Sequence, residues 1–199
     1  MKQFSIIVAA GFQNGIGQNG SIPWKEKEDM QFFRNMTTNT IDGNKVNAVI
    51  MGRATFESLN ETPLKNRINV VITSNKNYVD APPNLLFARS LDHALTLMRN
   101  TLSVERIFII GGQRLYEEAI VHPHCQYIYM NKIHHNGDYD TFFPEIDCKI
   151  FNLVDTIVLN KNVVAYMYVR QPVSPHHQYL LLFVAYIYPE YPGEIQPLY

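Results

Sequence analysis

The chain has few cysteines, little charge and no long hydrophobic run. Its two cysteines among 199 residues cannot form a disulfide framework, and without a C-x-x-C pair they indicate reduced thiols in a cytosolic protein. The longest apolar stretch, Tyr179 to Tyr188, is too short to span a membrane, and the N-terminus lacks the apolar segment of a secretion signal. We therefore expect a soluble, cytoplasmic protein.

An excess of positive charge is also missing. The formal net charge is -1 and no long basic run occurs, so a nucleic-acid partner has no electrostatic support. Seven histidines are present, but pairs such as His134-His135 and His176-His177 do not have the spacing of metal ligands, and no metal is expected. Hydrophobic residues make up 46% of the chain, which is enough for a packed core.

Hydrophobic runs and helical spacing alternate along the first two thirds of the chain. Strands are predicted at Phe4–Ala10, Asn47–Met51, Ile68–Thr73, Leu85–Ala88, Arg106–Ile110, Tyr127–Ile133, Phe151–Leu159 and Val163–Arg170, and helices at Glu26–Thr37, Ala54–Leu59, Leu91–Met98 and Gln113–Ile120. Alternation of this kind predicts an α/β fold with a mostly parallel central sheet and helices on both faces. The short Asn160-Lys161-Asn162 connection predicts a C-terminal antiparallel hairpin at the sheet edge.

The composition changes near residue 171. Five prolines, from Pro172 to Pro197, interrupt an aromatic stretch and prevent a long central strand. We expect one domain over residues 1–170 and a C-terminal extension over residues 171–199, dispensable for catalysis or involved in self-association of a chain otherwise expected to be a monomer. Pro82-Pro83 predicts a loop from Asn77 to Asn84.

Gly15-Ile16-Gly17-Gln18-Asn19-Gly20 matches the G-x-G-x-x-G pattern of dinucleotide-binding loops. In such loops a helix begins within the glycines, whereas here Ser21-Ile22-Pro23 precedes any helical spacing. A mobile lid over a site is therefore favoured over a Rossmann fingerprint.

Asp29 lies on the apolar side of the first predicted helix. It shares a helical face with Phe32, Phe33 and Met36, and a carboxylate facing a core is costly unless it is paired or hydrogen-bonded. Asp29 is thus a candidate functional acid, or else a first-turn residue that the helix dipole favours at the solvent rim. The spacing leaves both interpretations open.

Glycine turns after two predicted strands are candidate phosphate sites. Gly111-Gly112 precedes a helix, whose N-terminal amides favour an anion, and Gly52-Arg53-Ala54-Thr55 adds a guanidinium to the same arrangement. Arg89 follows another strand and is a second candidate cation. Plain strand-to-helix turns are the alternative for both segments.

From Phe4 to Arg170 the order of motifs resembles that of dihydrofolate reductases. The matching segments are Ile7-Val8-Ala9, Gly15-Ile16-Gly17, Asn19-Gly20, Ile22-Pro23-Trp24, Asp29, Phe33, Thr37, Val49-Ile50-Met51-Gly52-Arg53, Thr55, Glu57-Ser58, Pro63-Leu64, Arg67, Asn69, Ile109-Ile110-Gly111-Gly112, Tyr116 and Asp140-Thr141-Phe142-Phe143-Pro144. Each piece is short, but so many in one order are hard to obtain by chance.

The resemblance implies hydride transfer from NADPH to C6 of the pterin of dihydrofolate, with protonation at N5. It implies catalytic roles for Asp29, Trp24 and Asn131, with Asp29 holding the pterin. Phe33 would pack on the pterin or aminobenzoyl ring and Arg67 would pair with the glutamate α-carboxylate. The implied substrate contacts are completed by Ile7, Val8, Leu64 and Ile110.

The same resemblance implies NADPH as the cofactor. The implied cofactor contacts are Ala9, Ile16, Gly17, Gly20, Gly52, Arg53, Thr55, Ser74, Arg89, Gly111, Gly112, Gln113, Leu115 and Tyr116, and the Gly111-Gly112 peptide bond would be cis. The implied role is tetrahydrofolate biosynthesis in one-carbon metabolism, with antifolate-like molecules as further ligands.

Two positions depart from the family pattern. Asn131 replaces a threonine that is usually hydrogen-bonded to the carboxylate, and Phe56 replaces a common tryptophan; an amide can still donate to Asp29. His177-Gln178-Tyr179-Leu180 resembles the junction into thymidylate synthase in bifunctional enzymes. A pyrimidine reductase of riboflavin synthesis and a non-catalytic pterin- or nucleotide-binding module are the competing hypotheses.

Overall fold

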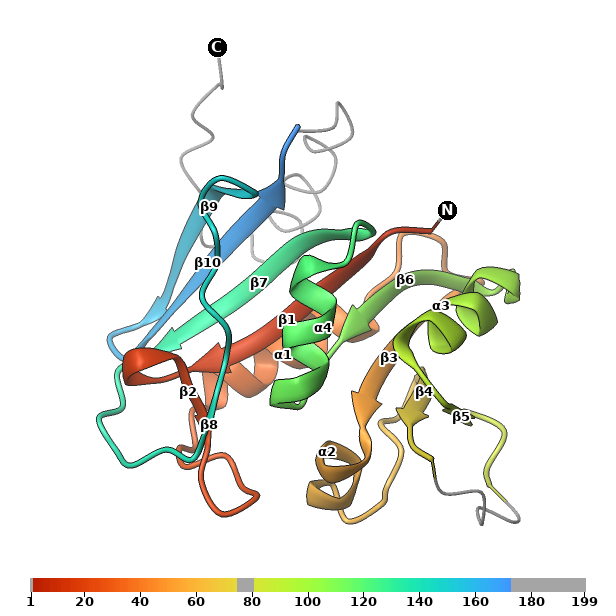
Figure 1. Ribbon diagram of the computed structural model, residues 1–199, viewed down its shortest axis with the longest axis horizontal. Helices are drawn as coiled ribbons and strands as arrows, with labels where there is room; N and C mark the ends of the chain where they lie inside the picture. The colour runs from red at the N-terminus through yellow and green to blue at the C-terminus, as the bar shows by residue number, and fades with distance from the viewer. Residues whose placement is uncertain (1, 75–80, 173–199) are drawn as a thin grey trace.

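The fold is seen in a computed structural model that describes residues 2–74 and 81–172 (Figure 1). One eight-stranded sheet has the order β5-β4-β3-β6-β1-β7-β10-β9, and a small ribbon pairs β2 with β8. The strands are β1 Phe4–Ala10, β2 Gly15–Gly17, β3 Val46–Gly52, β4 Arg67–Ile72, β5 Leu85–Ala88, β6 Val104–Ile109, β7 Cys125–Ile133, β8 Thr141–Phe142, β9 Phe151–Asn160 and β10 Val163–Arg170. The helices are α1 Lys27–Thr38, α2 Arg53–Ser58, α3 Leu91–Asn100 and α4 Gln113–Val121, with a 3-10 turn at Phe12–Asn14.

The first six strands of this order run parallel, from β5 to β7, and β10 and β9 close the sheet as an antiparallel hairpin. Strands such as β1 are buried along nearly their whole length because helices cover both faces. The mostly parallel sheet and the hairpin predicted from the sequence are thus confirmed. Most boundaries differ from the prediction by one or two residues, as helix and strand ends often do.

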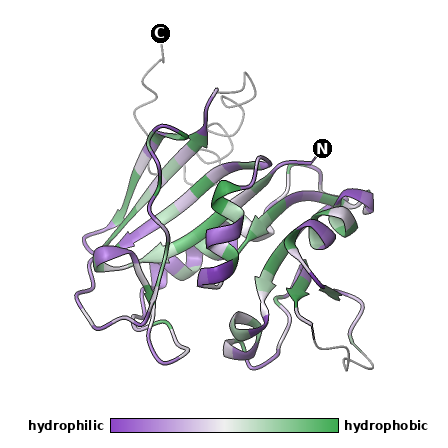
Figure 2. Cartoon of the chain, in the orientation of Figure 1, coloured by the Kyte–Doolittle hydropathy of each residue, from purple (hydrophilic) through white to green (hydrophobic). Residues whose placement is uncertain are grey.

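Each face of the sheet has its own hydrophobic core. In α3 the buried residues Leu91, Ala94, Leu95 and Met98 follow helical spacing and pack on one face, together with α4. Phe32 and Met36 of α1 and Phe56 of α2 pack on the other face. In the view of Figure 1, α4 lies in front of the sheet and α1 behind it. Figure 2 shows that the central strands are mainly hydrophobic, whereas the helices carry both kinds of residue.

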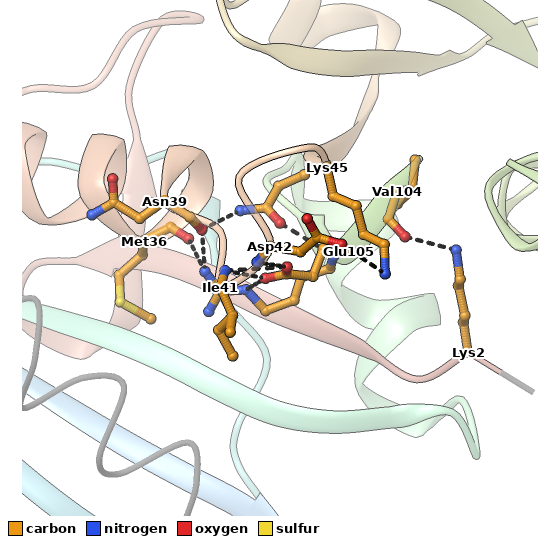
Figure 3. Close-up of polar contacts among 10 residues, drawn as sticks. Lys2, Met36, Asn39, Ile41, Asp42, Lys45, Val104 and Glu105 are labelled. Atoms are coloured by element: carbon orange, nitrogen blue, oxygen red, sulfur yellow. Dashed lines mark hydrogen bonds and ion pairs between the residues drawn. The ribbon is translucent and has the colours of Figure 1, made fainter. Parts of the chain in front are cut away.

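A polar network anchors the segment between α1 and β3 (Figure 3). Arg106 of β6 donates to the backbone oxygens of Asn39, at 2.6 Å, and Met36, at 3.2 Å. Beside it, Glu105 accepts from the amides of Ile41 and Asp42 at 2.9 Å. These bonds satisfy the last carbonyls of α1 and fix the helix on the sheet.

The ribbon of β2 and β8 was not predicted. The sequence indicated an irregular loop from Gly11 to Gly20, but Gly15 and Gly17 pair with Phe142 and Thr141. A three-residue strand has too few positions to show a period, so only its distant partner reveals it.

Two further sequence predictions concern residues outside the described part. Of the predicted loop from Asn77 to Asn84, only residues 81–84 are described, and they contain no helix or strand. The aromatic run Tyr179 to Tyr188 and the His177-Gln178-Tyr179-Leu180 segment lie wholly outside it. Within the described residues, no helix is both long enough and apolar enough to cross a membrane.

Candidate active site

The candidate site lies where the parallel strands end. The carboxyl ends of β1, β3 and β6 meet at one edge of the sheet, which is where ligands bind in open α/β folds. Backbone bonds hold two of these ends together, since Gly52 N donates to Gly111 O at 2.7 Å and Ile110 N donates to Ile50 O at 2.9 Å.

Asp29 is brought into this site by the first turn of α1. Its Oδ1 accepts a hydrogen bond of 2.8 Å from Nδ2 of Asn131, which lies near the end of β7 and is 2% exposed. Asn131 pairs with Ala9 of β1, so β1, β7 and α1 meet at the carboxyl. The structure favours the functional interpretation of Asp29, since its partner is a buried amide from a central strand.

Burial is the main influence on Asp29 and raises the pKa of its carboxyl above the ordinary value. The bond from Asn131 and the nearby indole of Trp24 lower the pKa, while the charge of Glu26 raises it further. The indole N–H of Trp24 has no acceptor at full hydrogen-bonding geometry within the described residues, so its influence is that of a nearby dipole. The net result is a carboxyl that holds its proton more readily than a solvated aspartate.

Tyr116 stands behind the site from α4. Its hydroxyl donates to the backbone oxygen of Ile7 at 2.9 Å, and burial, aided by the charge of Asp29, raises the pKa of this phenol. Tyr116 therefore stays neutral and ties α4 to β1.

Arg67 lies at the other end of α1, at the start of β4. Its guanidinium donates to Thr37 Oγ1 at 2.7 Å and to the backbone oxygen of Lys65 at 3.1 Å, and it lies 5.8 Å from the centre of the Phe33 ring. Arg67 is only 8% exposed, and no carboxylate of the described chain pairs with it. Burial, with the nearby charge of Arg34, lowers the pKa of Arg67 to about 10.

A glycine pair forms the turn between β6 and α4. The Gly111–Gly112 peptide bond is cis, as expected, and Gly111 has a φ of 135° that disfavours any side chain. A Cβ on Gly111 would lie 3.0 Å from Thr55 Oγ1 at the start of α2. The turn thus exposes backbone to a ligand beside the first residues of two helices.

The predicted phosphate-binding side chains follow neighbouring strands. Arg53 follows β3, Ser74 follows β4 and Arg89 follows β5, and all three are exposed. Arg53 makes a surface ion pair with Glu57, at 3.4 Å, which is weak enough for a phosphate to replace. These residues lie along the same edge of the sheet, after strands successively farther from Asp29.

The glycine-rich segment follows the carboxyl end of β1 and pairs with β8. No helix begins within it, since α1 starts only at Lys27, so the Rossmann interpretation has no support and the lid interpretation is favoured. Asn19 N donates to Asp140 Oδ2 at 2.6 Å, and Gly20 has a φ of 73° in open space. Ile16 packs on the core, and the backbone of Gly17 bonds to Asp140.

Apolar residues complete the site between Asp29 and Arg67. Those on the α1 face of the sheet are Ile7, Ala9, Trp24, Phe33, Leu64 and Ile110. The side chains of Val8 and Leu115 instead pack in the core on the opposite face, so only their backbone can face a ligand on the α1 side. Gln113 bridges Glu117 and the backbone of Phe142, linking α4 to the ribbon.

Thr37 is a site residue that was noted only as a family match. Its Oγ1 accepts from the Arg67 guanidinium and also donates to Phe33 O at 2.7 Å. Its spacing from Asp29 and Phe33, four residues at each step along one helix face, was the available signal.

Comparison with known proteins agrees with this geometry. A family model described as dihydrofolate reductase matches residues 3–171. The dihydrofolate reductase of Heliothis virescens is 39% identical over 157 residues, which cover 77% of this chain and 85% of that protein. Bifunctional dihydrofolate reductase-thymidylate synthase 1 of Arabidopsis thaliana is 38% identical over 156 residues, 75% of this chain but 30% of that protein.

A solved structure shares the fold. Dihydrofolate reductase from Enterococcus faecalis, in complex with NADP(H) and RAB-propyl, superposes with a TM-score of 0.70 at 32% identity, over 85% of this chain and 96% of the other. With the family model spanning the described sheet, the motif order and the site geometry, this chain belongs to the dihydrofolate reductase family.

Proposed function

We propose that this protein reduces 7,8-dihydrofolate to 5,6,7,8-tetrahydrofolate, with NADPH as the reductant. Family membership supports the reaction, because the relatives above are named dihydrofolate reductases and the solved neighbour contains NADP(H). The role that follows is tetrahydrofolate biosynthesis in one-carbon metabolism.

One observation carries the proposal: an acid and a buried cation lie at opposite ends of the same face of α1. Asp29, Phe33 and Thr37 lie on one line of the helix, and Thr37 holds Arg67. At 1.5 Å per residue, Asp29 and Thr37 are about 12 Å apart along the axis. A pterin at Asp29, an aminobenzoyl ring at Phe33 and a glutamate carboxylate at Arg67 fit this order of groups.

The sheet edge suits NADPH for independent reasons. A Cβ on either glycine of the Gly111–Gly112 turn would crowd Thr55 Oγ1, and Arg53, Ser74 and Arg89 offer donors along the same edge. The cofactor-binding residues that the sequence implied would hold the phosphates and riboses of NADPH at this edge. When bound, NADPH supplies the hydride that reaches pterin C6.

The chain's own contribution is orientation, water exclusion and one acid. Asp29 would bind the pterin edge that carries N3 and the 2-amino group, which leaves N5 out of its direct reach. The negative charge of its carboxylate would favour a protonated pterin, and water would deliver the proton to N5. Trp24 and the Gly15–Gly20 segment would keep bulk water from the reacting atoms.

A spectrophotometric assay tests the proposal. The purified protein should oxidise NADPH in the presence of dihydrofolate and be inhibited by antifolate compounds. Turnover of a ribosylated aminopyrimidine instead of dihydrofolate would indicate a pyrimidine reductase. Pterin binding without any NADPH oxidation would indicate a non-catalytic module.

Arg53 provides a test of cofactor choice. Arg53→Ala should weaken NADPH binding with little change for NADH, because only NADPH carries a 2′-phosphate for the guanidinium to bind. A charge-assisted contact of this kind contributes about 1.5–3 kcal/mol, so the NADPH dissociation constant should rise roughly tenfold or more. Titration of both cofactors measures this, and equal losses for the two would assign Arg53 to the pyrophosphate.

Residues 171–199 form, in this proposal, an extension that catalysis does not need. A chain truncated after Arg170 should retain turnover on dihydrofolate, because β10, the last strand within the described residues, ends at Arg170. Activity and circular dichroism of the truncated chain give the result. An insoluble product would assign the extension to the folded core.

The protein is proposed to be a cytoplasmic monomer in which both cysteines are reduced. Cys125 is buried and Cys148 exposed, and neither forms a disulfide. Self-association through the C-terminal extension is the alternative, and size-exclusion chromatography of the full and truncated chains distinguishes the two.

A further inference from the structure

His135 and Tyr139 form a hydrogen-bonded pair in the connection between β7 and β8. The Tyr139 hydroxyl donates to the His135 backbone oxygen at 2.7 Å and lies 2.8 Å from His135 Nδ1. Because a hydroxyl has one proton, its oxygen accepts from the imidazole N–H at Nδ1. The same backbone oxygen accepts from Phe12 N at 3.1 Å, so the pair is tied to the segment after β1.

The Tyr139 side chain lies directly against two glycines. A Cβ on Gly15 would be 2.1 Å from Cγ of the ring, and a Cβ on Gly11 would be 2.0 Å from the hydroxyl oxygen. Gly11 and Gly15 are joined by a backbone bond of 2.8 Å, and Gly15 begins β2 of the glycine-rich segment. The ring therefore lies against the base of the proposed lid, and neither glycine could carry a side chain unless the ring moved.

The other side of the pair contacts Trp24. The Trp24 ring centre lies 5.7 Å from that of His135 and 6.3 Å from that of Tyr139, the latter in an edge-on arrangement. Trp24 is 8% exposed and its indole acts on the Asp29 carboxyl. A continuous set of contacts thus runs from the base of the glycine segment to the acid of the site.

We propose that Tyr139 and His135 are positioning residues that hold the Gly11–Gly15 backbone and the Trp24 indole in place beside Asp29. The inference rests on the proposed reduction for its kinetic consequence. Neither residue reaches the substrate-binding line from Asp29 to Arg67, so the pair acts through Trp24 and the glycine segment. Its loss should slow the reaction more than it weakens dihydrofolate binding at Arg67.

Three variants test the pair. Tyr139→Ser removes the ring from Gly11 and Gly15, Tyr139→Phe keeps the ring and removes the hydroxyl, and His135→Ala removes the imidazole but leaves the backbone acceptor. Tyr127→Ser is the matched control, because Tyr127 is also a half-buried tyrosine but lies near the start of β7, away from the site.

Trp24 is the only tryptophan of the chain, so its fluorescence reports the contact without substrate or cofactor. Emission should shift to the red in Tyr139→Ser as the indole gains water, shift less in Tyr139→Phe, change in His135→Ala and stay unchanged in Tyr127→Ser. The kcat for dihydrofolate should fall roughly tenfold in Tyr139→Ser, as small misplacements of site groups cause, with a much smaller change in KM. Tyr139→Phe should recover most of the loss.

Parental emission in Tyr139→Ser, or shifted emission with parental kcat, would overturn the inference. An equal loss in Tyr127→Ser would also overturn it, because the effect would then be one of general stability. If the parent protein does not reduce dihydrofolate, the proposed function fails, yet the emission of the variants still decides whether the pair positions Trp24.

Discussion

Replacing Arg67 with leucine is expected to weaken dihydrofolate binding and at the same time to stabilise the unliganded protein. The guanidinium is buried at 8% exposure with a hydroxyl and a backbone oxygen as partners but no carboxylate among the described residues. A buried cation without an anion lowers stability, so an apolar side chain of similar length should raise the melting temperature. Loss of a charge-assisted pair, worth about 1.5–3 kcal/mol, should raise KM for dihydrofolate roughly ten- to hundredfold.

Substrate binding and stability are expected to change in opposite directions in Arg67→Leu. The variant therefore distinguishes a role in binding dihydrofolate from a role in the fold. Dihydropteroate, which lacks the glutamate, should be reduced equally well by the parent and the variant. Arg34→Leu is the matched control, because Arg34 is an exposed arginine near the same end of α1 and should leave KM for dihydrofolate almost unchanged. An Arg67→Leu variant that is less stable and has parental KM would show that the guanidinium serves the fold alone.

The sequence predicted most of the sheet because its strands carry local signals. Phe4–Ala10 is an apolar run, apart from Ser5, that is bounded by Gly11. The Lys161-Asn162 turn makes the β9–β10 hairpin a local structure. Where the signal was not local, prediction failed. The pairing of Gly15 with Phe142 joins segments far apart in the chain, and neither segment is long enough to have a period.

The same distinction applies to the site. Helical spacing placed Asp29 on an apolar face but could not separate a functional acid from a first-turn residue. The contact that decides, from Asn131, comes from a strand 102 residues later. The roles of Thr37 and Tyr139 were not predicted for the same reason. Thr37 contacts Arg67, and Tyr139 contacts Gly11 and Gly15, and only folding brings these residues together. Family resemblance supplied Asp29, Arg67 and the cis glycine peptide, but it assigned no role to Thr37 or Tyr139.

Replacing Asp29 with asparagine should lower turnover at neutral pH by roughly 10²-fold or more, the scale expected when an acid–base group is lost. The change keeps the volume and keeps an oxygen that can accept from Asn131 Nδ2, but it removes the charge that favours a protonated pterin. NADPH binding should be unaffected, because the glycine turn and Arg53 do not contact this carboxyl. At lower pH part of the rate should return, since solvent then supplies the proton.

The stability of the folded chain provides a second test of the Asp29→Asn variant. Burial raises the folded-state pKa of Asp29, so ionisation is less favourable in the folded chain than in the unfolded one. The resulting cost is absent below the ordinary pKa, grows as pH rises toward the raised folded value, and is complete above it. Asp29→Asn removes this cost, so the variant should be at least as stable as the parent at neutral pH and equal to it in strong acid.

The measurements are a pH–rate profile with NADPH and dihydrofolate, and thermal unfolding across the same pH range. Glu28→Gln is the matched control, because Glu28 is the adjacent carboxylate in the first turn of α1, outside the residues assigned to the site, and its loss should leave both profiles nearly parental. A slow but stable Asp29→Asn variant separates catalysis from folding, since the defect cannot then arise from an unfolded chain. Near-parental turnover at neutral pH would remove Asp29 from the mechanism, and with it the assignment of α1 as the substrate-binding helix.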